Sequence, residues 1–278
     1  MAALIRNPFV AGRFYPGTAQ EIKDLIERIR LTELSGIKYE LADKNIYGAI
    51  LPHAGHLYSG YETVHFFEIL HGTKQIFESF VIVHPIHRGV APEYACDASE
   101  RWSTPQGEVC LDTEFIEQSG IPVSSEQQKW EHSAEVLLPF MQYFIPYSFK
   151  IIPIGISHQT PEIAETISQH LVNAMRKTER KICLIASSDF THYVDPEKGK
   201  CMDEKVLEKI KNNDPEGIFR VIKDNNITVC GFGPIMTIIY YLKKMADDFK
   251  TTILRRGHSG EVVPSESVVD YISILFHS

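Results

Sequence analysis

The 278-residue chain contains only five cysteines, and no two of them are spaced as CxxC. The absence of this spacing argues against a structural zinc knuckle, and the odd number of cysteines argues against a disulfide framework. We therefore expect reduced thiols. Cys183 lies within the apolar run Ile182 to Ala186 and is expected to be buried and inert.

Long apolar runs are also missing. No segment approaches the roughly 18 apolar residues of a membrane span, and the first residues lack the apolar core of a secretion signal. A net charge of −8 argues against general affinity for nucleic-acid phosphates or anionic lipid. These features predict a cytoplasmic protein that binds neither nucleic acid nor membranes.

The chain shows no internal repeat and no linker rich in proline, glycine or serine. Because 44% of its residues are hydrophobic, it can bury a full core. We therefore predict one domain that spans residues 1–278.

Apolar patterns of strand and helix type alternate along the chain. Strands are expected at 46–51, 80–84, 150–156, 181–186, 227–230, 251–255 and 268–276. Helices are expected at 20–30, 61–70, 136–144, 161–176, 203–211, 215–223 and 234–245. This alternation predicts an α/β fold, a layered sandwich with a mixed central β-sheet flanked by helices.

Several metal-capable side chains follow the predicted strands directly. His53 precedes Ala54 and Gly55, which leave little side-chain bulk around it, and Cys230 precedes Gly231. In an open α/β sheet, ligands collect outside the carboxyl ends of the strands, so these side chains are expected to share one cleft. His56 is expected to bond a backbone carbonyl instead.

Two histidines compete for the position after strand 80–84. Either His84 or His87 can turn inward there, and the residues alone do not separate them. His132 has two readings, as a residue at a helix end or as a support for the site. Ser133 is expected to cap the helix that follows it.

The segment Ser187-Ser188-Asp189-Phe190-Thr191-His192 places a carboxylate near an imidazole after a strong strand. Such a pair suits a metal site or a general base. No GxSxG turn accompanies the two serines, which argues against a serine hydrolase. A cysteine combined with histidines suits iron, copper or zinc better than magnesium or calcium.

In order, these segments resemble the Memo family, whose members are similar in fold to class III extradiol ring-cleavage dioxygenases. The resemblance rests on motifs spread over almost the whole chain. They are Ala11-Gly12-Arg13-Phe14-Tyr15-Pro16, Pro52-His53-Ala54-Gly55 with Tyr58-Ser59-Gly60, Trp102-Ser103-Thr104-Pro105-Gln106-Gly107, Glu131-His132-Ser133 with Glu135, Ser187-Ser188-Asp189-Phe190 with His192, Cys230-Gly231, and His258-Ser259-Gly260.

The resemblance implies a metal site formed by His53, His87 and Cys230, with His192 and Asp189 at the pocket. It thereby favours His87 over His84. The chain departs from the family here, because His84-Pro85-Ile86-His87-Arg88 stands where Gly-Pro-Ser-His-His is usual. This departure implies a changed pocket rim, with His84 as the alternative ligand.

In the ring-cleaving relatives the third ligand is a carboxylate, which Cys230 replaces. The expected activity is therefore redox chemistry at iron or copper, with His192 as acid and base and Asp189 orienting it. The alternative is a binding module that uses the same pocket for a phosphopeptide or another anionic ligand, with Arg88 at the rim. The resemblance to microbial members also implies a radical S-adenosylmethionine protein and an AMMECR-type protein as partners.

Overall fold

The computed structural model describes residues 4–88, 92–246 and 248–278. At the centre of its sheet, four neighbouring strands run parallel. They are, in order across the sheet, β7 (Lys150–Ile156), β3 (Ser79–Pro85), β8 (Ile182–Ser187) and β2 (Ile46–Leu51). The predicted α/β class is confirmed, since further strands of both directions extend these four.

These further strands lie on both sides of the parallel core. Beyond β2, the antiparallel strands β11 (Val268–His277) and β10 (Lys250–His258) close one edge. Beyond β7 come β6 (Gly107–Leu111), β5 (Arg101–Thr104) and β1 (Ile5–Arg6). Two short strands pair outside this path, β4 (Tyr94–Cys96) with β7 and β9 (His192–Val194) with β11.

Every residue of β3 and β8 is buried. Strands covered on both faces need continuous apolar sequence, which explains their lack of polar alternation. Gly48 of β2 is required by its close approach to β8, because a β-carbon there would overlap the carbonyl oxygen of Leu184.

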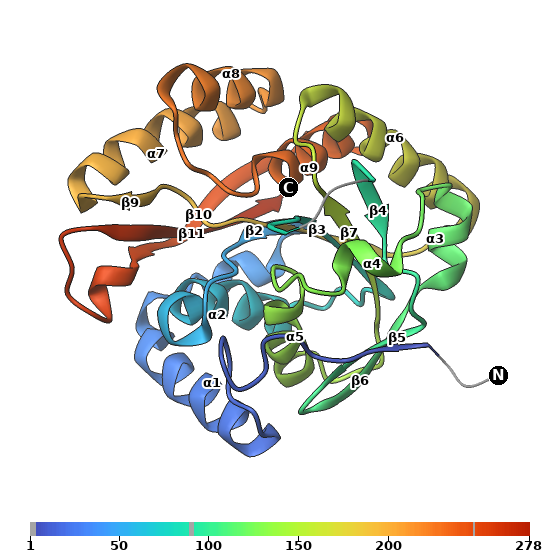
Figure 1. Ribbon diagram of the computed structural model, residues 1–278, viewed down its shortest axis with the longest axis horizontal. Coiled ribbons are helices and arrows are strands. Elements are labelled where there is room, and N and C mark those ends of the chain that lie inside the picture. The colour runs from blue at the N-terminus through green and yellow to red at the C-terminus, as the bar shows by residue number, and fades with distance from the viewer. Residues whose placement is uncertain (1–3, 89–91, 247) are drawn as a thin grey trace.

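Helices cover both faces of the sheet (Figure 1). One layer holds α1 (Ala19–Glu33), α2 (His56–Gly72) and α5 (Leu138–Phe144). The other holds α3 (Thr113–Ser119), α6 (Pro161–Thr178), α7 (Pro196–Lys211), α8 (Pro215–Asn225) and α9 (Phe232–Met245). Shorter helices are α4 (Ser125–Gln128), η1 (Leu34–Gly36), η2 (Tyr39–Asp43), η3 (Glu135–Leu137) and η4 (Ser259–Glu261). Among the described residues, no helix has both the length and the apolarity needed to cross a membrane.

Three helices begin where proline and a capping side chain meet. Proline opens α6, α7 and α8, and the preceding residues Thr160, Asp195 and Asp214 accept hydrogen bonds from backbone N–H groups of the first turn. Proline fits this position because the first N–H groups of a helix have no partner within the helix. The predicted helices at 161–176 and 215–223 are confirmed, and each ends two residues later than predicted.

Two local predictions are wrong. Residues 227–229 form no strand and Cys230 lies in a turn, because this segment meets the 189–192 segment through isolated hydrogen bonds rather than a ladder. Ser133 does not cap a helix, since its hydroxyl donates to the carbonyl oxygen of Pro85 instead. The helix that follows has no side-chain cap.

The loop after β8 is anchored to β11 and α7. The backbone N–H of Phe190 donates to the Asp270 carbonyl oxygen at 2.9 Å. The backbone N–H of Asp270 in turn donates to the Thr191 carbonyl oxygen at 2.8 Å. The Thr191 hydroxyl donates to Oδ1 of Asp203 at 2.6 Å, and Arg256 pairs with Oδ2 of that carboxylate at 3.1 Å. These contacts fix the loop that carries Asp189 and leads into His192.

Replacement of Asp270 by asparagine is expected to stabilise the protein at pH 8. Burial, together with the charge of Asp203, raises the pKa of Asp270 to about 8. Between pH about 4 and 8 the folded chain therefore holds a proton that the unfolded chain has lost, so stability from this group falls as pH rises through that range. We expect Asp270→Asn to raise the melting temperature at pH 8 by about 2 to 4 °C, and to have less effect at pH 5.

Thermal unfolding at both pH values measures this effect. Asp224→Asn, at an exposed position on α8, is the matched control and should leave the melting temperature unchanged at both pH values. An equal shift at pH 5 and pH 8 in Asp270→Asn would contradict the raised pKa.

Candidate functional site

The candidate site lies where β2, β3 and β8 end. These strands are neighbours and parallel, so the residues that follow them meet at one edge of the sheet. His53 follows β2, His87 follows β3 and Asp189 follows β8. Cys230 comes from the turn before α9. The structure thus brings these four predicted residues to the same edge of the sheet.

His53 is buried, and its tautomer follows from its neighbours. The Ser187 hydroxyl donates its only proton to the Ser133 carbonyl oxygen at 2.6 Å, so it must accept one from Nδ1 of His53 at 2.8 Å. The free lone pair of the imidazole is therefore on Nε2. Burial, helped by the nearby His87 and His132, holds the pKa of His53 well below its usual value, so the ring is neutral near pH 7.

Nε2 of His53 faces the thiol of Cys230, with 3.2 Å between nitrogen and sulfur. The backbone N–H of Asp189 donates to the same sulfur at 3.2 Å. Burial and the negative charge of Asp189 raise the pKa of Cys230 well above its usual value. The thiol is thus protonated in the protein alone, and a cation at this position would displace its proton.

Glu131 holds two further histidines. Nδ1 of His87 donates to its Oε1 at 3.0 Å, and Nδ1 of His132 lies 3.2 Å from the same oxygen. Although burial alone raises the pKa of the Glu131 carboxyl, hydrogen bonds from His132 and His87 hold it well below its usual range. The same contact raises the pKa of His87 against the opposing effect of burial. The carboxylate is therefore ionised, and neither Nε2 atom has a hydrogen-bond partner among the described residues.

The three imidazoles form a cluster. One ring nitrogen each from His53, His87 and His132 lies within 4.8 Å of the others, a spacing at which they can bind one metal ion. His87 and His132 retain 33% and 19% of their side-chain exposure, so the cluster opens to solvent on their side. The sequence predicts that His132 either ends a helix or supports the site. The structure instead places it in the cluster itself.

No local sequence signal reveals His132 as a member of the cluster. It lies between α4 and η3, far from any strand end, and only the fold brings it to His53, with ring centroids 5.6 Å apart. Its neighbour Glu131 was missed for the same reason.

Of the two competing histidines, the structure brings His87 to His53, with ring centroids 5.1 Å apart. His84 is fully buried inside β3, where Nδ1 contacts the Ser133 hydroxyl and Nε2 contacts the Gln128 amide oxygen. Burial lowers the pKa of His84 to about 4. Because both ring nitrogens already have protein partners, His84 packs inside the sheet beside Ser133 and Gln128 and is not positioned as a metal ligand.

Asp189 and His192 lie near His53 but are not bonded to one another in the described chain. Oδ1 of Asp189 accepts from the backbone N–H of His53 at 2.8 Å, and burial raises the pKa of its carboxyl. His192 is oriented by the carbonyl oxygen of Thr228, 2.7 Å from its Nδ1. The expectation that Asp189 orients His192 is therefore wrong, because Thr228 performs this role.

Other predicted residues occupy simpler roles. Nε2 of His56 contacts the Val136 carbonyl oxygen at 2.6 Å, as expected, and Cys183 is fully buried. Ser188 accepts from the backbone N–H of Gly231 and donates to the Asp189 carbonyl oxygen, so it is no nucleophile. Arg88 is exposed beside His87.

This fold and this edge define a layered α/β protein with a cluster of three histidines after the central strands and a cysteine beside one of them. The family model described as Memo-like protein matches residues 6–275. The chain belongs to the Memo family, as its sequence motifs indicated.

Curated relatives agree with this assignment, and one solved structure is similar in fold. A MEMO1 family protein of Sulfurisphaera tokodaii is 35% identical over 98% of this chain and 99% of its own length. Another from Methanosarcina mazei is 33% identical over 98% of both chains. The crystal structure of an uncharacterised protein from Escherichia coli K12 covers 83% of this chain and 99% of its own, with a TM-score of 0.50 at 15% identity, and it is similar in fold.

Replacement of Ser187 by alanine is expected to release the tautomer of His53. In the wild type, Nδ1 carries the proton because the Ser187 hydroxyl accepts it. Nitrogen NMR of labelled histidine in the metal-free protein should show one tautomer for His53, and a mixture in Ser187→Ala. Ser188→Ala, which removes a neighbouring hydroxyl without touching His53, should behave as the wild type, and an unchanged spectrum for Ser187→Ala would refute the assignment.

Proposed function

We propose that the chain is a non-haem metal-binding protein that holds iron or copper at His53, His87 and Cys230, and that this centre carries out redox chemistry. The observation that supports the proposal is the orientation of the histidines. Nδ1 of His53, His87 and His132 each has a protein partner, which leaves three Nε2 atoms for a cation. Metal-binding histidines typically have this arrangement, with a carboxylate or another oxygen on the second nitrogen.

The donor set fits such an ion. The 3.2 Å between Nε2 of His53 and Sγ of Cys230 is shorter than one metal–nitrogen and one metal–sulfur bond together, so a single ion can bind both. Imidazole and thiolate favour iron, copper or zinc, and disfavour the oxygen-preferring magnesium and calcium. His132 supplies a further nitrogen on the solvent side of the cluster.

Bound iron or copper would supply one-electron redox chemistry, which these side chains do not supply alone. The chain itself contributes the positions of the donors and of one proton carrier. Thr228 fixes the ring of His192 through Nδ1, so Nε2 is the atom that would take a proton from a substrate hydroxyl. Asp189 holds the backbone at His53 and places a buried carboxyl at the pocket.

The test is metal analysis after anaerobic reconstitution with ferrous iron, cuprous copper or zinc. The wild type should retain about one equivalent of iron or copper. Cys230→Ser and His87→Ala should lose most of it, because each removes one ligand. His84→Gln should retain it, since the wild-type nitrogens of that residue are already occupied.

His71→Ala, which removes an exposed histidine in the last turn of α2, away from the site, controls for histidine content. If neither wild type nor variants retain metal, the proposal fails, and an anionic-ligand module that uses Arg88 and the same pocket becomes the better account. If His84→Gln loses the metal and His87→Ala retains it, His84 rather than His87 is the ligand.

Replacement of Glu131 by glutamine is expected to weaken metal affinity by about 10- to 100-fold, the usual cost of losing a carboxylate behind metal-binding histidines. The amide removes the charge that orients His87 and His132 while keeping nearly the same size. Competition with a chromophoric chelator measures the affinity. Glu126→Gln, at an exposed glutamate on α4, is the control, and equal affinity for both variants would show that Glu131 does not orient the ligands.

A further inference from the structure

A cavity lies at the opposite end of the sheet from the histidines. It has a volume of about 710 Å³ and is lined by Ile46 and Ile182, which begin β2 and β8, together with the ends of α6 and α9. The histidine site follows the other ends of the same strands. The proposed metal centre therefore plays no part in this cavity.

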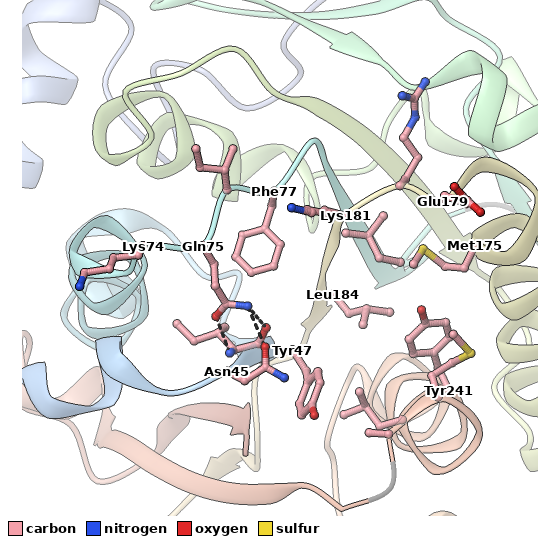
Figure 2. A pocket seen from close by; sticks show the side chains of 17 residues that line it. Asn45, Tyr47, Lys74, Gln75, Phe77, Met175, Glu179, Lys181, Leu184 and Tyr241 are labelled. Atoms are coloured by element: carbon pink, nitrogen blue, oxygen red, sulfur yellow. Dashed lines mark hydrogen bonds between the residues drawn. The ribbon is translucent and has the colours of Figure 1, made fainter.

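The walls of this cavity are largely apolar (Figure 2). The apolar side chains include Phe77, Met175, Leu184, Leu242 and Met245. Small-molecule sites are typically concave, apolar and of several hundred cubic ångströms, with a few polar groups that orient the ligand. The volume leaves room for a body larger than one aromatic ring.

One polar group in the wall has no partner. Tyr241 of α9 is 4% exposed, and its hydroxyl makes no hydrogen bond within the described part of the chain. Figure 2 shows this hydroxyl directed into the cavity, toward the side chains of Leu184 and Met175. The adjacent Tyr240, by contrast, donates to Glu216 at 2.7 Å. This hydroxyl keeps some contact with solvent and bonds no other described residue, so Tyr241 is available to donate to a ligand.

Positive charge dominates the rim. Lys74 and Lys181 are exposed at the cavity, and no ion pair involves either of them among the described residues. Figure 2 shows the Lys181 ammonium group on the Phe77 side, with the carboxylate of Glu179 on the far side, near Met175. The Lys181 side of the rim thus suits a carboxylate.

We propose that this cavity binds an aromatic carboxylic acid that carries a hydroxyl at the end remote from its carboxylate. The carboxylate pairs with Lys181 at the rim, the aromatic body packs against Phe77 and Leu184, and the remote oxygen accepts from Tyr241. The apolar walls favour the rings, and the two polar groups at different depths favour a ligand with two polar ends.

Three probes separate these contributions. The first is 4′-hydroxybiphenyl-4-carboxylate, the second is biphenyl-4-carboxylate, which lacks the hydroxyl, and the third is 4-hydroxybiphenyl, which lacks the carboxylate. Isothermal titration measures each on the full chain. We expect saturable binding of the first probe, with one equivalent bound.

Matched variants then test the two contacts. Tyr241→Phe should weaken binding of the hydroxy acid about five-fold, because its hydrogen bond is lost. Binding of the acid that lacks the hydroxyl should stay unchanged. Lys181→Gln should weaken binding of both acids and leave binding of the neutral phenol unchanged. Tyr240→Phe should change none, since its hydroxyl bonds Glu216 outside this cavity. Equal melting temperatures establish that the variants are folded.

Three results would overturn the proposal. One is no saturable binding of the hydroxy acid at 1 mM, and another is equal weakening of both acids in Tyr241→Phe. The third is loss of binding in His87→Ala, which would assign the ligand to the histidine pocket. None of these results bears on metal retention, so the two proposals fail separately.

Discussion

The site depends on one buried carboxylate. Glu131 accepts from Nδ1 of His87 and from the backbone N–H groups of His87, His132 and Ser133. It therefore determines both where the imidazoles lie and which nitrogen each presents. A buried carboxylate is stable only when hydrogen bonds and nearby positive charge replace its water, and here the groups that stabilise Glu131 are the ones that the site uses. The histidine cluster and the loop that carries it therefore share one hydrogen-bond network.

The sequence predicted most of the fold because the central strands are apolar throughout. Strand 46–51 and strand 150–156 were predicted with their observed ends. Strands β4, β5 and β6 were missed, since short strands at the side of a sheet depend on pairing rather than on their own apolar pattern. Residues 227–229 show the reverse case, in which a β-prone sequence finds no neighbouring strand to pair with.

The candidate site divides in the same way. His53, Asp189 and Cys230 were found because they follow apolar runs or precede glycine, and a parallel sheet brings strand ends together. Neither His132 nor Glu131 has such a signal, because their positions depend on how a loop between two short helices folds over the sheet. The choice between His84 and His87 needed the hydrogen bonds that occupy His84. The cavity around Tyr241 lies where strands begin, and no motif in the sequence indicates a site there.

In the proposed centre, histidine nitrogen and the Cys230 sulfur bind the same ion. X-ray absorption at the metal edge of the iron- or copper-reconstituted protein tests it most directly. We expect nitrogen neighbours together with one sulfur at about 2.3 Å, the length typical of a metal–thiolate bond, and we expect the sulfur to be absent in Cys230→Ser. A spectrum with nitrogen and oxygen neighbours alone in the wild type would contradict the claim.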